Sequence, residues 1–383
     1  MKTTATPFSW ADPDVDAVHD MATKFFQTEV LPHEDRFIEQ KHVDRDLWHK
    51  AGALGLLCAA VPEEYGGGGG THAHDFAIYD AQFRVGATSL GVAAHSGLVT
   101  PYLVAYANDE QRQRWLPRMV TGEYIGAIAM TEPGAGSDLK ALRTTARRDD
   151  DHYVINGSKT FISNGGMADL VLVATTTDPS AGAKGISLIV VETANLTGFK
   201  VGRLLNKMGL RGQDTAELYF EDVRVPADNL LGEPGSGFGY LMKQLVHERL
   251  MVALFAAANT AAAVAETIEH TKQRHIFGAP LFTMQNTRFE LAKCQSLAEV
   301  SRTFVDRCVE RHLAGDLDAA GASMAKAFCS DTEGQVLDRC LQLFGGYGYM
   351  MEYPIARRYT DARVSRIYGG ANEVMYELIA RSL

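Results

Sequence analysis

A single glutamate, Glu248, stands in the largely apolar stretch "QLVHERLMVALFAAA". Met251, Val252 and Phe255 follow it at i+3, i+4 and i+7, so these side chains share one face of a helix. Apolar surroundings raise the pKa of a carboxyl group, which makes it a stronger base than a solvated glutamate. The pattern therefore predicts a proton acceptor at Glu248. The alternative is a structural acid paired with a nearby arginine.

A glycine pair, Gly369 and Gly370, lies near the C-terminus in "RIYGGANEVMYELI". It separates a tyrosine from the expected start of a helix. Adjacent glycines are costly in an ordered segment, because they lose the most backbone freedom on folding. The pair therefore predicts a place where another group approaches the backbone, or where the chain turns and a Cβ would clash.

The glycine-rich loops at 134–138 and 232–239 do not carry a nucleotide fingerprint. Neither forms GxGxxG within a βαβ unit, and the sequence contains no GxxxxGK[ST] and no GxSxG. A nicotinamide-binding fold, a nucleoside triphosphatase and the usual serine hydrolase are thereby disfavoured. His72 and His74 form the only HxH, beside five glycines, and we predict a solvated loop there and no metal site.

The overall charge and composition exclude further classes. A net charge of −10 argues against nucleic acid as a partner. The five cysteines are scattered without a CxxC spacing, which suits a reduced cytosol. The N-terminus carries acids and no apolar core of a signal peptide, and the longest apolar run is too short to span a bilayer. We therefore expect a soluble, cytoplasmic protein without a membrane span.

The 383 residues divide into three regions with different sequence patterns, which predict an α+β, mostly α fold. Residues 1–123 have helical periodicity and form the first domain. Residues 124–233 carry short β-branched runs cut by turn signals, which predict an antiparallel, barrel-like β-domain. Residues 234–383 are expected to form a four-helix bundle. Its expected helices are Phe238–Lys272, Gln285–Leu313, Leu317–Phe344 and Glu373–Leu383.

Seven motifs in this order resemble the acyl-CoA dehydrogenase family, and together they cover essentially the whole chain. They are "PEEYGG" (62–67), "MTEPGAGSDL" (130–139), "NGSKTFISNG" (156–165), "MGLRGQDTAELYFEDVRVP" (208–226), "QRHIFG" (273–278), "LQLFGGYGY" (341–349) and "IYGGANE" (367–373). The resemblance implies an N-terminal helical domain, a middle β-domain and a C-terminal four-helix bundle.

The resemblance also implies a reaction. Family members use FAD to remove the α and β hydrogens of an acyl-CoA thioester, giving the trans-2-enoyl-CoA. A base takes the α-proton, the β-hydrogen leaves as hydride to flavin N5, and electron-transferring flavoprotein receives the electrons. Many members carry the base where Gly369 stands here, whereas long-chain and isovaleryl-CoA dehydrogenases carry it on a bundle helix. Glu248 matches that second pattern, and the backbone N–H of Gly369 is expected to donate to the thioester carbonyl.

Further roles follow motif by motif from the resemblance. Gly370 is expected to make room for the thioester, Arg249 to lie near CoA, and Ser137 to lie near CoA and the pyrophosphate. Ala371, Asn372 and Glu373 replace a Thr-Asn-Glu that touches FAD, and Ala371 lacks the usual hydroxyl. The residues expected along the flavin ring are Met130, Thr131, Phe161, Ile162 and Ser163.

A last set implies self-association. Six residues resemble those that a neighbouring subunit lends to the FAD adenosine and pyrophosphate, so a homotetramer arranged as a dimer of dimers is expected. They are Arg274, Phe277, Gln285, Gln342, Gly345 and Gly346. Two alternatives remain: a catalytically silent subunit of a heteromeric dehydrogenase, and a flavin monooxygenase on the same fold. Acyl length, branching and the choice between CoA and an acyl carrier protein stay open.

Overall fold

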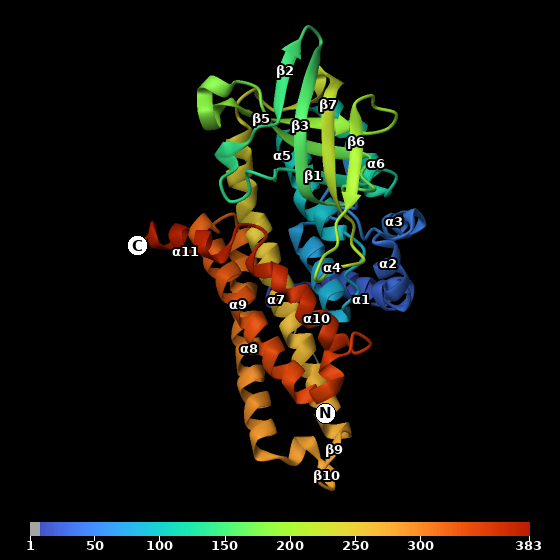
Figure 1. Cartoon of the computed structure of the whole chain (residues 1–383), viewed down its shortest axis with the longest axis vertical. Helices are drawn as coiled ribbons and strands as arrows, with labels where there is room; N and C mark the ends of the chain where they lie inside the picture. The colour runs from blue at the N-terminus through green and yellow to red at the C-terminus, as the bar shows by residue number, and fades with distance from the viewer. Residues whose placement is uncertain (1–7) are drawn as a thin grey trace.

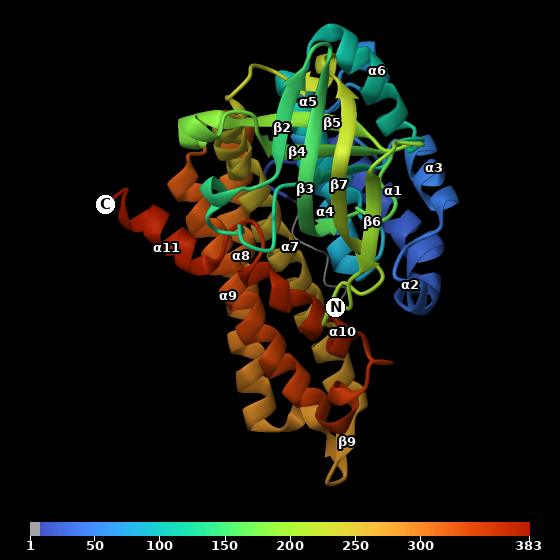
Figure 2. The same ribbon diagram turned by 45° about the horizontal axis from the view of Figure 1, so that its top comes forward.

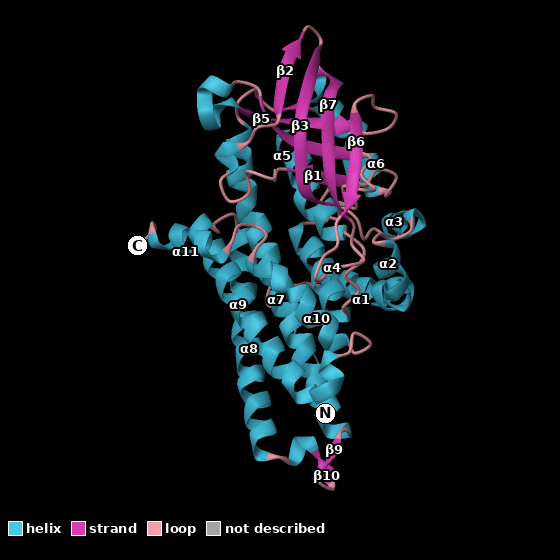
Figure 3. Cartoon of the chain, viewed as in Figure 1, coloured by secondary structure: helices cyan, strands magenta, loops and turns pink. Residues whose placement is uncertain are grey.

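The computed structural model describes residues 8–383. Helices, a β-sheet and a long helical bundle follow one another along the chain. The sheet occupies one end of the longest axis and the bundle extends to the other (Figure 1; Figure 3). This order confirms the predicted fold, with helical domains on both sides of a middle β-domain.

The N-terminal helices begin at side chains that cap them. Asp12 accepts hydrogen bonds from the N–H groups of Asp14 and Val15 at the start of the first helix. Thr71 and His74 form a capping box at the start of the fourth. The helices are α1 (Pro13–Phe25), α2 (Glu34–Gln40), α3 (Arg45–Ala53), α4 (His72–Val85), α5 (Thr100–Tyr106) and α6 (Asp109–Val120).

The sheet has the strand order β6-β7-β3-β2-β4-β5-β8, and β1 pairs with β4 outside this path. Its bounds are β1 (Gly126–Ala129), β2 (Thr145–Asp149), β3 (His152–Ser163), β4 (Leu170–Thr176), β5 (Ile186–Glu192), β6 (Phe199–Leu204), β7 (Thr215–Pro226) and β8 (Leu230–Leu231). Most pairs are antiparallel, as predicted. The β1–β4 pair is parallel, because two other strands intervene in the chain and supply the crossover that a parallel pair needs.

The C-terminal bundle is built on α7 (Gly237–Gln273), α8 (Gln285–Leu313) and α9 (Ala319–Phe344). The helix α10 (Pro354–Ala362) packs on α7 and α9, and α11 (Asn372–Ala380) packs on α9 (Figure 2). A small hairpin, β9 (His275–Ile276) and β10 (Ala279–Pro280), joins α7 to α8. The start of α9 lies two residues later than predicted, because Asp318 caps it through the N–H of Gly321.

Helix α7 has 37 residues. It is longer than the apolar run within it, which is predicted from the sequence to be too short to span a bilayer. Within residues 8–383 it is the one helix long and apolar enough to cross a membrane by length and composition. However, 72% of its most apolar window is buried inside the protein. That burial is the pattern of a central core helix.

One continuous apolar core joins the N-terminal helices, the start of α7 and one face of the sheet. Phe76, Tyr102, Leu188 and Leu250 all belong to it and are nearly inaccessible. The opposite face of the sheet has a separate core. The first third of α7 therefore lies where the three domains meet, and Glu248 is on that segment.

Candidate active site

Glu248 is buried on α7, with 4% of its surface exposed. Its Oε1 accepts a hydrogen bond of 2.9 Å from the phenol of Tyr102 on α5. Just before α5, residues Ala93–Val99 form a π-helical turn that presses against α7. There a Cβ on Gly97 would clash with the side chain of Met251. This close approach brings α5 onto α7 and fixes the carboxyl group of Glu248 from one side.

Burial raises the pKa of Glu248 to about 7, against the smaller opposing effects of the Tyr102 hydrogen bond and the Arg249 charge. Within residues 8–383 the carboxyl group makes no ion pair, and Tyr102 is its side-chain partner. The alternative of a structural acid paired with an arginine is thus unsupported. A carboxyl group with a pKa near neutrality is suited to accept a proton.

The glycine loop lies against the same segment of α7. Gly369 and Gly370 have φ of +64° and +95°, conformations that L side chains rarely adopt. A Cβ on Gly369 would meet only Val252 Cγ2, at 3.5 Å. Val252 follows Glu248 at i+4, so the loop and the carboxyl group belong to one site.

The carbonyl groups of the loop are held from two helices. Nε of Arg249 donates to the Gly369 oxygen at 3.4 Å, and Nζ of Lys326 on α9 donates to the Gly370 oxygen at 2.8 Å. In contrast, the N–H of Gly369 has no acceptor within residues 8–383. The loop therefore presents a fixed, uncommitted donor on the same side of α7 as the buried carboxyl group of Glu248.

Lys326 also anchors the start of α11. Its side chain is fully buried and donates to Oδ1 of Asn372 at 2.7 Å. The amide of Asn372 donates in turn to Ser330 and Asp331, both at 3.0 Å. The Asn372 side chain is thus committed within the chain, Ala371 is the N-cap of α11, and Glu373 is exposed. Their contacts with FAD stay predictions.

The residues predicted along the flavin ring come together at the ends of β1 and β3. The Thr160 N–H donates to the Thr131 oxygen at 2.9 Å, and Lys159 Nζ donates to the Met130 oxygen at 3.2 Å. Between Lys159 and Ile162 the pairing of β3 with β7 is irregular, and Phe161 has a φ of +59°. This strain is of the kind that clusters at ligand sites.

The side chain of Phe161 is 68% exposed, whereas Ile162 is buried and Ser163 half-buried. A large aromatic ring held open in a strained backbone fits the face of a planar aromatic cofactor. A Cβ on Gly369 would meet a single atom, so the absence of a side chain there also leaves room for a ligand beside the loop. Ser137 lies in an exposed turn after β1. These residues therefore fit FAD as a group.

A cavity of about 150 Å³ lies between the end of α4, α7 and α10. Phe83, Phe255, Asn259, Glu333 and Tyr368 are among its lining residues. Phe255 and Asn259 continue along α7 from Glu248, and Tyr368 directly precedes the glycine loop. Glu248 and Gly369 are not among its lining residues, so this cavity lies farther along α7 than the predicted base.

The residues predicted to serve a neighbouring subunit do not join this site within one chain. They gather at the far end of the bundle, where β9 and β10 lie opposite the sheet (Figure 1). The Arg274 guanidinium lies 5.5 Å from the ring centre of Tyr347, beside the end of α9. The others there are Phe277, which is 97% exposed, and the exposed Gln285, Gln342, Gly345 and Gly346.

The prediction of a solvated loop at His72 and His74 is wrong. Both residues lie in the first turn of α4, because Thr71 caps the helix there. His74 accepts from the Thr71 N–H and its Nε2 lies 3.0 Å from Asp14 Oδ2. His72 instead meets His247 and His312, two residues that no sequence pattern joined to it.

Tyr102 and Lys326 are the site residues that sequence reasoning missed. Lys326 had a readable signal, since it lies one helical turn from the apolar Ala322 and Cys329 and all three are buried. A lysine on such a face needs acceptors, and the structure supplies them from the glycine loop. Tyr102 gave no comparable signal.

The fold brings an N-terminal helical domain, a β-domain and a helical bundle together around the buried carboxyl group of Glu248. Residues 12–123, 127–223 and 235–383 match the family descriptions of the N-terminal, middle and C-terminal domains of acyl-CoA dehydrogenase. The chain belongs to the acyl-CoA dehydrogenase family.

Individual relatives agree along nearly the full length. The mitochondrial long-chain specific acyl-CoA dehydrogenase of Sus scrofa is 46% identical over 370 residues, 96% of this chain and 86% of the relative. A crystal structure of acyl-CoA dehydrogenase from Geobacillus kaustophilus is 45% identical with a TM-score of 0.95, covering 98% of this chain and 99% of that chain. The Bacillus anthracis enzyme, solved as a complex with FAD, is 31% identical with a TM-score of 0.92, covering 98% and 69%.

Family membership confirms the predicted resemblance and fold class. It also confirms the prediction of an FAD-dependent acyl-CoA dehydrogenase. The individual roles of the site residues stay predictions.

Proposed function

We propose that this enzyme converts an acyl-CoA thioester to the trans-2-enoyl-CoA, with Glu248 as the base that takes the α-proton. The observation that carries the proposal is the buried carboxyl group of Glu248, which forms no ion pair with any residue of 8–383, on the helix that packs against the Gly369 loop. When bound, FAD supplies the acceptor for the hydride that leaves the β-carbon.

Glu248 performs its role through burial. Removing water from the carboxyl group strengthens it as a base, and the 2.9 Å hydrogen bond from Tyr102 fixes its orientation. Tyr102 is itself buried, and burial raises its pKa well above the ordinary value. It therefore remains a neutral donor and does not compete for the α-proton.

Gly369 performs its role through its backbone. As the α-proton leaves, negative charge grows on the thioester oxygen, and a fixed N–H stabilises that charge. The two loop carbonyls are held by Arg249 and Lys326, so the N–H groups are oriented before the substrate arrives. Arg249 and Lys326 act as positioning residues in this scheme, and Arg249 remains a candidate for contact with CoA.

The partners follow from the family and the surface of the bundle. We propose electron-transferring flavoprotein as the electron acceptor, since the sequence lacks a nicotinamide fingerprint. We propose a cytoplasmic homotetramer, a dimer of dimers. Some of the residues predicted to bind FAD lie around β9 and β10, whereas Phe161 lies on β3, at the other end of the molecule (Figure 1). A second subunit would therefore be needed to bring the two sets together. Exposed apolar side chains at the far end of the bundle, including Phe277 and Tyr349, support an interface.

An anaerobic titration tests the proposal. Purified yellow enzyme is mixed with acyl-CoAs of increasing chain length, from butyryl to long-chain thioesters, and the flavin absorbance is recorded without oxygen. Bleaching by at least one of these thioesters is expected, and the best one defines the acyl length. If no acyl-CoA bleaches the flavin, the proposal is contradicted. That result is the one expected of a catalytically silent subunit or a flavin monooxygenase.

A further inference from the structure

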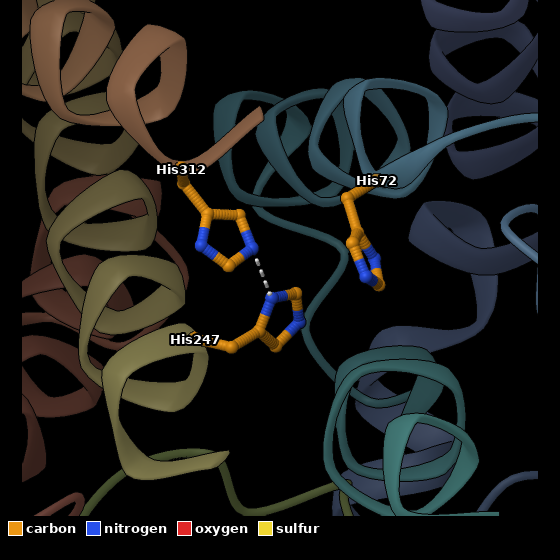
Figure 4. Close-up of side chains that lie close together, drawn as sticks. All are labelled: His72, His247 and His312. Atoms are coloured by element: carbon orange, nitrogen blue, oxygen red, sulfur yellow. Dashed lines mark hydrogen bonds between the residues drawn. The ribbon is translucent and has the colours of Figure 1, made fainter. Parts of the chain in front are cut away.

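Three histidines from separate elements converge outside the proposed active site. His72 begins α4, His247 lies on α7 and His312 lies near the end of α8 (Figure 4). Their ligand nitrogens all lie within 4.8 Å of one another. The Nδ1 of His247 and the Nε2 of His312 are already 3.1 Å apart, the one hydrogen bond drawn within the cluster (Figure 4).

The cluster is incompletely satisfied by the protein. His247 is 4% exposed, and its Nε2 is buried without a partner within residues 8–383. The Nδ1 of His72 is also buried without a hydrogen bond in the same part of the chain, with Asp75 Oδ2 at 3.5 Å. Buried ring nitrogens without partners are destabilising, so each such group calls for an explanation.

We propose that His72, His247 and His312 form a binding site for one divalent transition-metal ion, with Zn²⁺ as the chemical type. Three imidazole ligands and an open fourth position are a known zinc arrangement. Nitrogens bound to one tetrahedral Zn²⁺ at about 2.0–2.1 Å lie about 3.3 Å apart. His247 Nδ1 and His312 Nε2, at 3.1 Å, are already close to this spacing, and binding of the ion would replace the hydrogen bond between them.

The ligand set selects the class of metal. Imidazole nitrogens suit zinc, copper, nickel and iron, whereas magnesium and calcium take oxygen ligands. A neutral imidazole ring offers the lone pair that a metal ion needs, and three such rings converge here. The His72 side chain is 39% exposed and provides an entry path from solvent.

A bound ion would tie α4 of the N-terminal domain to α7 and α8 of the bundle. His247 directly precedes Glu248, so the tie would fall on the segment of α7 that carries the proposed base. The metal site itself rests only on the histidine geometry. Its test therefore stands or fails independently of the proposed reaction.

The test uses the untagged FAD-loaded enzyme, stripped with a chelating resin and titrated with Zn²⁺ under isothermal calorimetry. One Zn²⁺ per chain is expected to bind, and X-ray absorption at the zinc edge should show three imidazole nitrogens at about 2.0–2.1 Å. Co²⁺ in place of Zn²⁺ should give the visible spectrum of a tetrahedral site. The thermal midpoint of the enzyme should rise with added Zn²⁺.

Variants assign the ligands. His72→Gln lies at the accessible edge and His312→Gln at the end of α8, so neither removes the buried His247 beside Glu248. Each substitution should weaken Zn²⁺ binding by more than about 100-fold. Replacing a residue that only hydrogen-bonds to a metal ligand typically lowers metal affinity by about 10–100-fold, and the loss of a ligand itself should cost more. The exposed His33 provides the matched control, His33→Gln, which should bind as the wild type does.

Retained FAD and an unchanged circular dichroism spectrum show that each variant is folded. Equal Zn²⁺ affinity in wild type, His72→Gln and His312→Gln would overturn the proposal. A wild type that binds no Zn²⁺, or binds it through oxygen ligands, would overturn it as well.

Discussion

Replacing Glu248 by glutamine should lower the activity of the enzyme while raising its stability, and the gain in stability should depend on pH. Glutamine keeps the shape of the side chain and the oxygen that accepts from Tyr102, but it carries no charge at any pH. The fold, the FAD content and acyl-CoA binding are therefore expected to survive. Turnover should fall by at least the roughly 10²–10⁴-fold that general base catalysis contributes.

The effect on stability can be worked from the pKa of Glu248. Burial raises it from 4.5 to about 7, so ionisation in the folded state is disfavoured. The wild type is unaffected below pH 4.5 and loses stability as the pH rises from 4.5 to about 7. Because one pKa unit corresponds to about 1.4 kcal/mol, the loss reaches about 3 kcal/mol at pH 8. Glutamine escapes this loss, and the variant should become more stable than the wild type by that amount.

The assay compares urea unfolding of the two FAD-loaded proteins between pH 5 and pH 8. The difference in the free energy of unfolding should widen from about 1 kcal/mol to about 3 kcal/mol, and other titrating groups cancel in the difference. Glu34 supplies a matched control, since burial also raises its pKa to about 7 while it bonds Ser89 in the N-terminal domain. Glu34→Gln should gain stability likewise but keep full activity. A constant difference for Glu248→Gln across this pH range would refute the argument.

Three further substitutions probe the surroundings of the base. Tyr102→Phe removes a hydrogen bond that lowers the pKa of Glu248, so the rising limb of the kcat/KM pH profile should move up by about one pH unit. Phe161→Ala should change the free energy of unfolding of the apoprotein by less than about 0.5 kcal/mol, because the ring is exposed. It should nevertheless weaken FAD binding about tenfold by equilibrium dialysis. Lys326→Met should lower kcat more than it raises KM, because it frees the Gly370 carbonyl; an unchanged kcat would contradict the anchoring role.

Much of the fold could be predicted from local patterns. The helix Gln285–Leu313 was predicted with the bounds that the structure shows, because its polar and apolar residues alternate with helical periodicity. The parallel β1–β4 pair could not be read from the sequence, since β1 is four residues long and its partner follows two other strands. Strand pairing of this kind depends on tertiary packing, which short-range patterns do not encode.

The site residues also divide into those that the sequence predicts and those that it does not. Glu248 and the glycine pair were visible because each violates a local expectation, a charge on an apolar face and two flexible residues before a helix. Tyr102 was not visible, because 146 residues separate it from Glu248. The three histidines lie on three elements, and the sequence predicts a loop at His72, where Thr71 caps α4 instead. Partners brought together only by folding leave no spacing to detect.

The rate of anaerobic flavin reduction in Glu248→Gln, with and without Gly369→Glu, tests the central claim most directly. A Cβ at position 369 has only an ordinary contact with Val252, so a side chain can begin there, but its φ of +64° costs about 1–2 kcal/mol. The single variant should reduce its flavin far more slowly than the wild type on mixing with acyl-CoA. The double variant should recover part of that rate, because the second carboxylate reaches the same α-proton. Reduction by Glu248→Gln at the wild-type rate, with FAD fully bound, would show that the base lies elsewhere.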